Sequence, residues 1–198
     1  MIKVLLCSNS SIKEQAIKKW FKSNLKEVVV IEKHPVKDKL LPPQPLNTGG
    51  KLCCSDRIRE ARNNCDINLY DYIIAIESSI NTNSETLEDI VNVIVENCQT
   101  GETFETSGKP IEINFTIMSK YSSFIKILDD FIKNYEDSNK DYIYDGCEMT
   151  LGKIINHYYP EIPDDNWMKF MFNKDRVNQI HKTLDQISCS MKDDLESL

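Results

Sequence analysis

The chain has 198 residues, of which 40% are hydrophobic and 28% are charged. This length and composition predict one folded domain with a sizeable core. The 24 lysine and arginine residues are outnumbered by 31 aspartate and glutamate residues. The resulting net charge of −7 argues against the broad basic face that general nucleic-acid binding requires.

Features of membrane and exported proteins are missing from the sequence. No apolar run approaches the ~20 residues that span a bilayer, and the N-terminal apolar stretch is too short for a signal peptide. The seven cysteines are odd in number and form no CxxC pair, which argues against a disulfide framework or a structural zinc site. We therefore expect a reduced, cytoplasmic protein with neither a membrane nor a nucleic acid as partner.

Strands and helices alternate at the start of the chain, and a hairpin lies in the middle. Residues 2–7 are a short apolar run typical of a buried strand, and residues 12–21 have helical spacing, with Ser10 or Ser11 as the N-cap. Residues 33–52 contain four prolines and the pair Gly49-Gly50, which predict a long irregular loop. In chain order, the predicted strands are 2–7, 28–32, 71–76, 88–97, 102–107 and 111–117, and the predicted helices are 12–21, 55–65, 118–135 and 173–188.

These elements predict an α/β (α+β) fold with a mixed, twisted sheet flanked by helices. We expect one domain over residues 1–190, with a proline-rich turn at 158–166. The tail 191–198 is expected to be disordered.

The polar turn after the first strand is the first candidate site. A strand–turn–helix corner directs backbone N–H groups and the positive end of the helix dipole at the space above it. The side chains of Ser8, Asn9, Ser10, Ser11 and Lys13 suit phosphate oxygens. The alternative is an ordinary serine-capped helix with a solvated lysine.

Glu77 is the second candidate. It follows the apolar segment Tyr72–Ile76 directly and so lies at the carboxyl end of a predicted strand, where open α/β sheets bind their ligands. A carboxylate there is costly to desolvate unless it is paired or binds a metal. The alternative is a glutamate that already lies in solvent at the strand end.

Taken together, these segments resemble the inosine/xanthosine triphosphatase family of house-cleaning nucleotide phosphatases. The matching pieces occur in order and span most of the chain: Ser8–Lys13 after a strand, Leu41–Leu46, the helix at Arg57–Ala61, Tyr72–Glu77 and Thr150–Lys153. The hairpin ending at Asn97 and the segment Thr106–Pro110 are also similar. The resemblance implies an ITPase-like fold with two lobes and a cleft between them.

The resemblance also implies an activity and a set of site residues. Members hydrolyse inosine and xanthosine triphosphates to the nucleoside diphosphate and phosphate. The reaction implies Mg²⁺, with Mn²⁺ as an alternative, and members form homodimers. Carried over by position, Lys13, Asp38 and Glu77 would be catalytic, and Asp38 and Glu77 would hold the metal. The positions implied for substrate binding are Ser8, Asn9, Ser10, Ser11, Lys13, Ser78, Thr150 and Gly152.

Several positions depart from the family pattern. The chain has Ser10 where the family has asparagine, Ser78-Ser79 where it has two small residues, Gly49-Gly50-Lys51 where it has a Glu-Thr pair, Cys53-Cys54 where it has Gly-Ala, and Asn156 where it has arginine. These changes keep two alternatives open. One is a nucleotide- or protein-binding module that retains the fold without turnover, and the other is a pyrophosphatase that releases pyrophosphate and a monophosphate.

Overall fold

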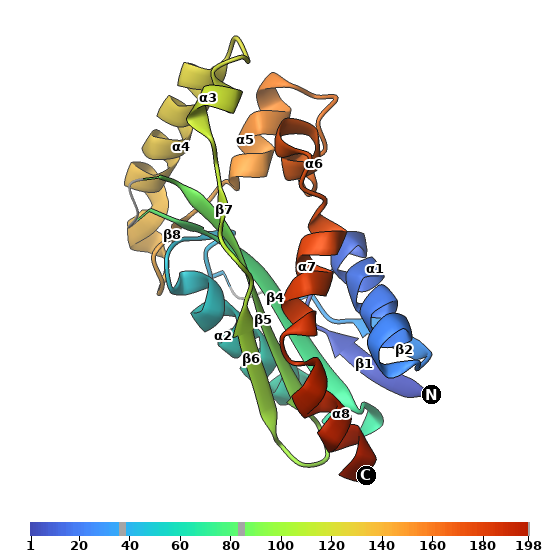
Figure 1. The fold of residues 1–198 in the computed structure, drawn as a ribbon. Helices are drawn as coiled ribbons and strands as arrows, with labels where there is room; N and C mark the ends of the chain where they lie inside the picture. Colours follow the sequence, from blue (N-terminus) through green and yellow to red (C-terminus); the bar gives the residue numbers. More distant parts are fainter. Residues whose placement is uncertain (36–38, 83–85, 198) are drawn as a thin grey trace.

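The computed structural model describes residues 1–35, 39–82 and 86–197 (Figure 1). Its strands are β1 (Ile2–Leu6), β2 (Val29–Lys33), β3 (Gln44–Pro45), β4 (Tyr72–Asn81), β5 (Glu88–Asn97), β6 (Thr103–Ser107), β7 (Ile111–Glu112) and β8 (Gly146–Cys147). Its α-helices are α1 (Ser11–Trp20), α2 (Gly49–Asn64), α3 (Phe115–Met118), α4 (Phe124–Ser138), α5 (Leu151–Tyr158), α6 (Trp167–Phe172), α7 (Arg176–Asp185) and α8 (Ser188–Ser197). A π-helical turn, η1 (Phe21–Leu25), and two 3₁₀ turns, η2 (Ile67–Leu69) and η3 (Asn139–Asp141), connect these elements.

The main sheet has the strand order β2-β1-β4-β5-β6, with β7 paired to β5. The β1–β2 and β1–β4 pairs are parallel, whereas β4, β5, β6 and β7 pair antiparallel. A separate two-stranded ladder joins β3 to β8. The predicted mixed sheet flanked by helices is therefore confirmed.

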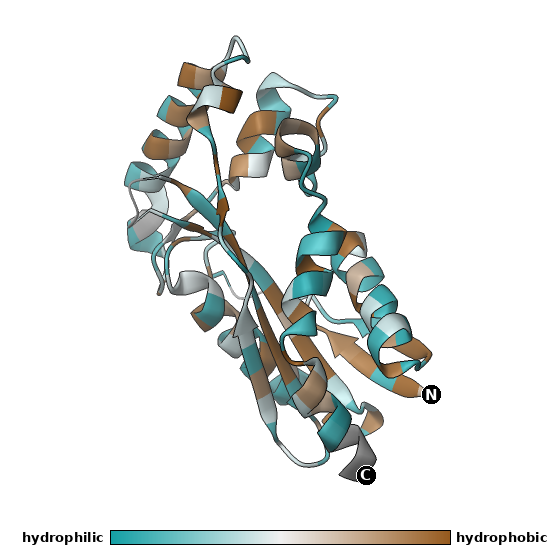
Figure 2. Ribbon diagram, viewed as in Figure 1, coloured by the Kyte–Doolittle hydropathy of each residue, from teal (hydrophilic) through white to brown (hydrophobic). Residues whose placement is uncertain are grey.

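Helices cover both faces of the sheet and define two cores. On one face, α1, α7 and α8 pack on the alternate strand residues Ile74 and Ile76, and Trp20 of α1 is fully buried there. On the other face, α2 packs on Ile73 and Ala75. Figure 2 shows that the central strands are mostly hydrophobic, whereas the outer helices carry hydrophilic residues along part of their surface.

A third core lies at one end of the sheet. Helices α3 to α6 gather there around Leu46, Ile80 at the end of β4, and Met168 of α6. These helices form a second lobe beside the sheet (Figure 1). Within the described residues, no helix has the length and apolar character needed to cross a membrane.

β1 is the point at which the chain changes direction across the sheet. From β1 the chain passes through α1 to β2 on one side, and later returns through α2 to β4 on the other side. Because α1 and α2 lie on opposite faces, the carboxyl end of β1 is a topological switch point, where open α/β sheets leave a crevice for ligands.

The predicted loop over residues 33–52 is wrong at its end, because α2 already begins at Gly49. The two glycines do not break the chain there; they let the helix approach its neighbours. A Cβ on Gly50 would lie 2.5 Å from Asn92 Nδ2 and 2.8 Å from Ser79 Cβ. Glycine at this position therefore brings α2 directly onto β4 and β5.

Three further predictions differ from the structure in the C-terminal half. The predicted strand 111–117 ends at Glu112, because the Asn114 side chain accepts a hydrogen bond from the Ile117 N–H and caps α3. The helix predicted from residue 118 begins only at Phe124. The tail expected to be disordered from residue 191 continues α8 to Ser197, and Met191 is fully buried in the core beneath α1 and α7.

Candidate functional site

A cavity of about 270 Å³ lies at the carboxyl end of β1, and we call it the corner cavity. It is lined by Ser10, Ile12, Lys13, Pro43, Gln44, Ile76, Glu77, Ser78, Asp89, Thr150, Gly152, Lys153, Asp164, Asp165, Trp167, Arg176 and Ile180. These residues come from the first turn of α1, from β4, from the α5–α6 region of the second lobe and from α7, with Pro43 and Gln44 at β3 and Asp89 of β5. The cavity therefore lies at the switch point, between the sheet and the second lobe.

The turn after β1 is held by its own serines. The Ser10 N–H donates to Ser8 Oγ at 3.2 Å, and Ser10 Oγ accepts from the Lys13 N–H at 3.3 Å as the N-cap of α1. The capping interpretation is therefore correct for Ser10. Ser10 and Lys13 also line the corner cavity, so the cap does not exclude a role in binding.

Lys13 contacts β4 beyond the end of its ladder with β1. The β1–β4 ladder ends at the pair Leu6–Ile74, so the next part of β4 has no partner from β1. Lys13 Nζ donates to the free carbonyl of Ile76 at 2.5 Å and lies 3.5 Å from Glu77 Oε1. Strand termination thus places an ammonium group against the backbone at the mouth of the cavity.

Glu77 lies between two cations, and not at the end of its strand as predicted, because β4 continues past it to Asn81. It follows Ala75 in the strand alternation and faces α2, where Arg57 Nε lies 2.6 Å from Glu77 Oε1. The Glu77 side chain is only 11% exposed, and the Lys13 and Arg57 side chains are each 18% exposed. The two cations outnumber the one carboxylate beside Glu77, but the lining also carries Asp89, Asp164 and Asp165 against Lys153 and Arg176, so the excess positive charge is confined to the surroundings of Glu77.

The thiols beneath this corner are protected by burial. Burial raises the pKa of the Cys7 thiol to about 12, with the charges of Arg57 and Lys13 acting in the opposite direction. Burial also raises the pKa of Cys54, and the Glu77 carboxylate adds to that rise. A thiolate nucleophile is therefore unfavourable at either position.

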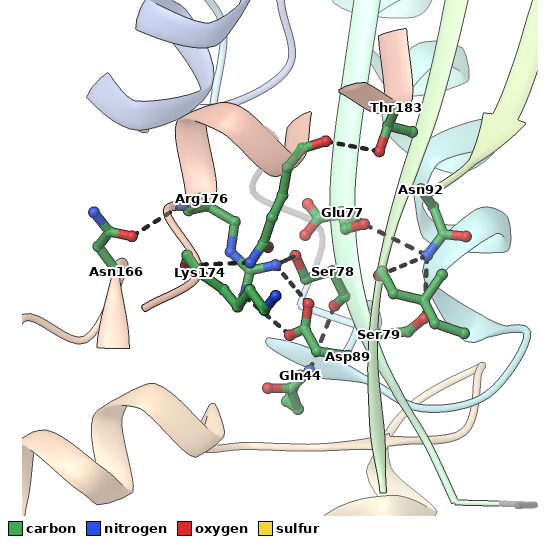
Figure 3. A network of polar contacts seen from close by, with 12 residues as sticks. Gln44, Glu77, Ser78, Ser79, Asp89, Asn92, Asn166, Lys174, Arg176 and Thr183 are labelled. Atoms are coloured by element: carbon green, nitrogen blue, oxygen red, sulfur yellow. Dashed lines mark hydrogen bonds and ion pairs between the residues drawn. The ribbon is translucent and has the colours of Figure 1, made fainter. Parts of the chain in front are cut away.

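An ion pair buried behind Ser78 forms another wall. Arg176 of α7 donates to both carboxylate oxygens of Asp89, at 2.5 and 2.9 Å, and its Nη1 also donates to Ser78 Oγ at 3.0 Å (Figure 3). Burial opposes the charge of Arg176, but the Asp89 carboxylate outweighs it and raises the pKa of Arg176 above its usual value. Because Ser78 Oγ is held in this way, its hydroxyl position in the cavity is fixed.

Gln44 links β4 to the second lobe. Its Nε2 donates to the Ser78 carbonyl at 3.4 Å, and its Oε1 accepts from the Leu151 N–H at 3.2 Å. Thr150 caps α5 by accepting from the Lys153 N–H at 3.2 Å. Gln44 therefore fixes the first turn of α5 against the strand that carries Glu77.

Gly152, which matches the family pattern, and Asn156, which departs from it, both have structural roles. A Cβ on Gly152 would lie 2.0 Å from the Asp164 carbonyl oxygen, so only glycine admits the 160–166 segment at this distance. Asn156 Nδ2 donates to the carbonyls of Pro160 and Ile162, at 3.3 and 2.8 Å. The asparagine at this position thus holds the proline-rich turn at 158–166.

The structure brings together six of the predicted site residues and separates others. Those that line the corner cavity are Ser10, Lys13, Glu77, Ser78, Thr150 and Gly152. Ser8, Asn9 and Ser11 belong to the turn but are not among its lining residues. Asp38 lies outside the described residues.

Four residues of this region were missed from the sequence: Gln44 and Arg57 as positioning groups, and Asp89 and Arg176 as a buried pair. Arg57 lies on a predicted helix that carries three of the chain's arginines, but nothing local shows that it faces Glu77. A signal for the pair existed, since Asp89 is a carboxylate near the start of a predicted strand, directly before the apolar pair Ile90-Val91. Its partner is 87 residues away, which sequence spacing does not reveal.

Glu77 is the described residue of this corner that the resemblance implies as a metal ligand. Within the described ranges, no group of three or more His, Cys, Asp or Glu side chains could hold a metal ion. Mg²⁺, however, is commonly bound by one or two carboxylates together with substrate phosphates and waters. Glu77 meets that requirement, since its carboxylate can offer Oε2 to a cation while Oε1 stays paired.

Comparisons with known proteins bear on the fold. No family model and no curated protein matches the chain. Among solved structures, it is similar to protein VC0702 from Vibrio cholerae, with 15% identity over 93% of this chain and 91% of that chain and a TM-score of 0.65. At this identity, the likeness shows that the two chains share a fold.

Proposed function

We propose that the protein is a Mg²⁺-dependent hydrolase of deaminated purine nucleoside triphosphates, such as ITP and XTP. The observation that carries the proposal is the convergence of Lys13, Glu77 and Ser78 with Ser10 and Thr150 in one cavity at the topological switch point. The resemblance to the inosine/xanthosine triphosphatases, which rests on the same residues, supports the substrate class.

The residues of the corner would bind and orient the triphosphate. Lys13 and the first turn of α1 would neutralise charge on the phosphoryl oxygens, and the Ser10 and Ser78 hydroxyls would donate hydrogen bonds to them. A water molecule would attack the γ-phosphorus, and the bond from the γ-phosphorus to the oxygen shared with the β-phosphate would break. The nucleoside diphosphate and phosphate would then leave. Thr150 and Gly152 would lie beside the nucleoside.

Glu77 would hold the metal against the phosphates. Mg²⁺, when bound, would neutralise the triphosphate and lower the pKa of the attacking water. The Arg57 and Lys13 contacts would keep the Glu77 carboxylate in one orientation, so that no side-chain reorganisation is needed when the metal–substrate complex arrives.

Hydrolysis of ITP, XTP, GTP and ATP, measured with and without Mg²⁺, tests the proposal. Phosphate and pyrophosphate should be measured separately. We expect phosphate release that is fastest with ITP or XTP, requires Mg²⁺ and falls about 100-fold or more in Glu77→Gln. The matched control is Glu105→Gln, which breaks a surface ion pair with Lys51. Unchanged turnover in Glu77→Gln would overturn the mechanism, and pyrophosphate release would reassign the reaction to a pyrophosphatase.

The paired state of Glu77 favours a second candidate function. A carboxylate that is already within 2.6 Å of an arginine has less need of a metal, and the corner then suits anion binding without turnover. The second candidate is therefore a nucleotide-binding module. It predicts saturable ITP binding in EDTA with neither product released, and Mg²⁺-dependent turnover would exclude it.

A further inference from the structure

A second, larger cavity of about 770 Å³ lies along α7, and we call it the α7 cavity. Its walls are α7, the segment joining β6 to β7, and the residues just before α7. Asp89 lines both this cavity and the corner cavity, and its carboxylate is held by Arg176 (Figure 3). The buried ion pair is therefore part of the boundary between the two cavities.

The floor of the α7 cavity depends on a close approach of backbone to helix. The Gly108 N–H donates to the Val91 carbonyl at 2.7 Å, which keeps the chain on the sheet after β6. A Cβ on Gly108 would lie 2.4 Å from Thr183 Oγ1 of α7. A side chain at position 108 would push this segment away from α7, so glycine permits the close approach that forms the floor of the cavity.

The charges at the rim favour an anion. Lys109, Lys174 and Lys182 line the cavity and are exposed, and none of the three is in an ion pair with a described carboxylate. The nearby acidic groups are largely occupied: Asp89 pairs with Arg176, and Asp175 caps α7 by accepting from the Asn178 N–H. Glu112 is exposed and also lines the cavity, so the three ammonium groups outnumber it and leave a smaller, local excess of positive charge in a chain of net charge −7.

Gln179 provides an unsatisfied acceptor in the same wall. Its Nε2 donates to the Lys174 carbonyl at 3.2 Å, which fixes the amide orientation, since the opposite assignment would set two oxygens against each other. Its Oε1 is buried and has no hydrogen-bond partner among the described residues. A buried acceptor without a partner is costly, and because this atom has almost no accessible surface, a ligand would donate an N–H to it only once the Gln179 side chain turns toward the cavity.

The remaining wall is apolar and of a size for a heterocycle. Ile111, Ile117 and the half-buried ring of Phe172 line it. Small-ligand sites commonly measure ~300–1,000 Å³ and combine such apolar walls with a few fixed polar groups. An apolar wall, one N–H acceptor and a rim of ammonium groups together match a nucleobase that carries a phosphate.

We propose that the α7 cavity is a second binding site, for a nucleoside monophosphate. The base packs on Phe172 and Ile117 and donates an N–H to Gln179 Oε1, and the phosphate pairs with the lysines. The site does not require the hydrolytic function proposed for the corner cavity, because it uses neither Lys13 nor Glu77.

Calorimetric titration with inosine monophosphate in EDTA tests this site. The protein carries Lys13→Ala, so that the corner cavity is impaired. We expect one binding event, at least about 10-fold weaker for inosine or inorganic phosphate alone, because each lacks half of the contacts. Added Gln179→Leu should weaken binding about 5-fold or more. Lys182→Glu, at the exposed rim, should weaken it at least as much without disturbing the fold, and the exposed Lys126→Ala on α4 is the matched control.

The outcomes separate the two sites. Binding that survives Lys13→Ala but falls in Gln179→Leu and Lys182→Glu supports the α7 site, whether or not the protein hydrolyses ITP. Binding that is lost in Lys13→Ala alone would assign the nucleotide to the corner cavity and overturn the proposal. Absence of binding, or equal binding in Lys182→Glu and the unaltered chain, would also overturn it.

Discussion

Arg176 and Asp89, 87 residues apart, form a two-pronged ion pair in which the Arg176 side chain is 9% exposed and the Asp89 side chain is 3% exposed. Removal of one partner leaves a buried charge unpaired, so Asp89→Leu should lower the free energy of unfolding by about 3–5 kcal/mol. Denaturant unfolding followed by circular dichroism measures this loss.

The double variant Asp89→Leu/Arg176→Met is the control for that experiment. With both charges removed, most of the lost stability should return, because the cost arises mainly from the orphaned charge. If the double variant is as unstable as the sum of the single variants, the pair does not act as a unit.

Gly152→Ala should destabilise the protein although it lies in a helix. Alanine normally stabilises a helix interior by about 1 kcal/mol relative to glycine. Here the new Cβ would lie 2.0 Å from the Asp164 carbonyl oxygen, so the 160–166 segment must move. We expect a lower melting temperature, with His157→Ala at the exposed end of the same helix as control. A higher melting temperature in Gly152→Ala would contradict the packing described for this turn.

Tyr144 should contribute a pH-dependent stability. Its hydroxyl donates to the buried Asp56 carboxylate at 2.6 Å, and this bond, together with burial, raises the pKa of Tyr144 to about 12. A folded pKa above the unfolded value of 10.0 stabilises the fold below pH 10 and loses that contribution as the pH rises to about 12. Tyr144→Phe should therefore cost about 1 kcal/mol at pH 7, since the tyrosine is partly exposed, and progressively less above pH 10.

The matched control for Tyr144 is Tyr158→Phe, whose hydroxyl donates to the exposed Asp130. It should have the smaller effect at pH 7, because solvent replaces an exposed hydrogen bond more readily. Urea unfolding of the three proteins between pH 7 and 11 measures the difference. A Tyr144→Phe effect that grows with pH would reverse the assigned sign.

The thiols should react in two groups. Burial raises the pKa of Cys7 and of Cys147 to about 12 and also raises that of Cys54, whereas Cys189 is exposed. At pH 8, iodoacetamide should label Cys189 rapidly and leave Cys7, Cys54 and Cys147 unlabelled until denaturant is added. Mass spectrometry of the native and unfolded protein resolves the sites, and rapid native labelling of Cys7 would contradict its burial.

The short-range patterns of this chain were readable from its sequence. The hairpin 88–107 was predicted to within one residue, because apolar alternation and the Thr100-Gly101 turn act over neighbouring positions. The start of α2 was missed, because Gly49 and Gly50 read as loop residues until β4 and β5 supply the surface that they approach. At these positions, tertiary packing outweighs the low helix propensity of glycine.

The candidate site divides in the same way. The sequence by itself determined that Lys13 follows a strand–turn corner and that Glu77 directly follows the apolar segment Tyr72–Ile76, since both statements concern adjacent residues. Only the tertiary structure decided that Arg57 holds Glu77 from the opposite face and that Arg176 holds Ser78 and Asp89 from the end of the chain. Charges pair across any sequence distance once burial removes water from between them, so their partners are fixed by packing and not by spacing.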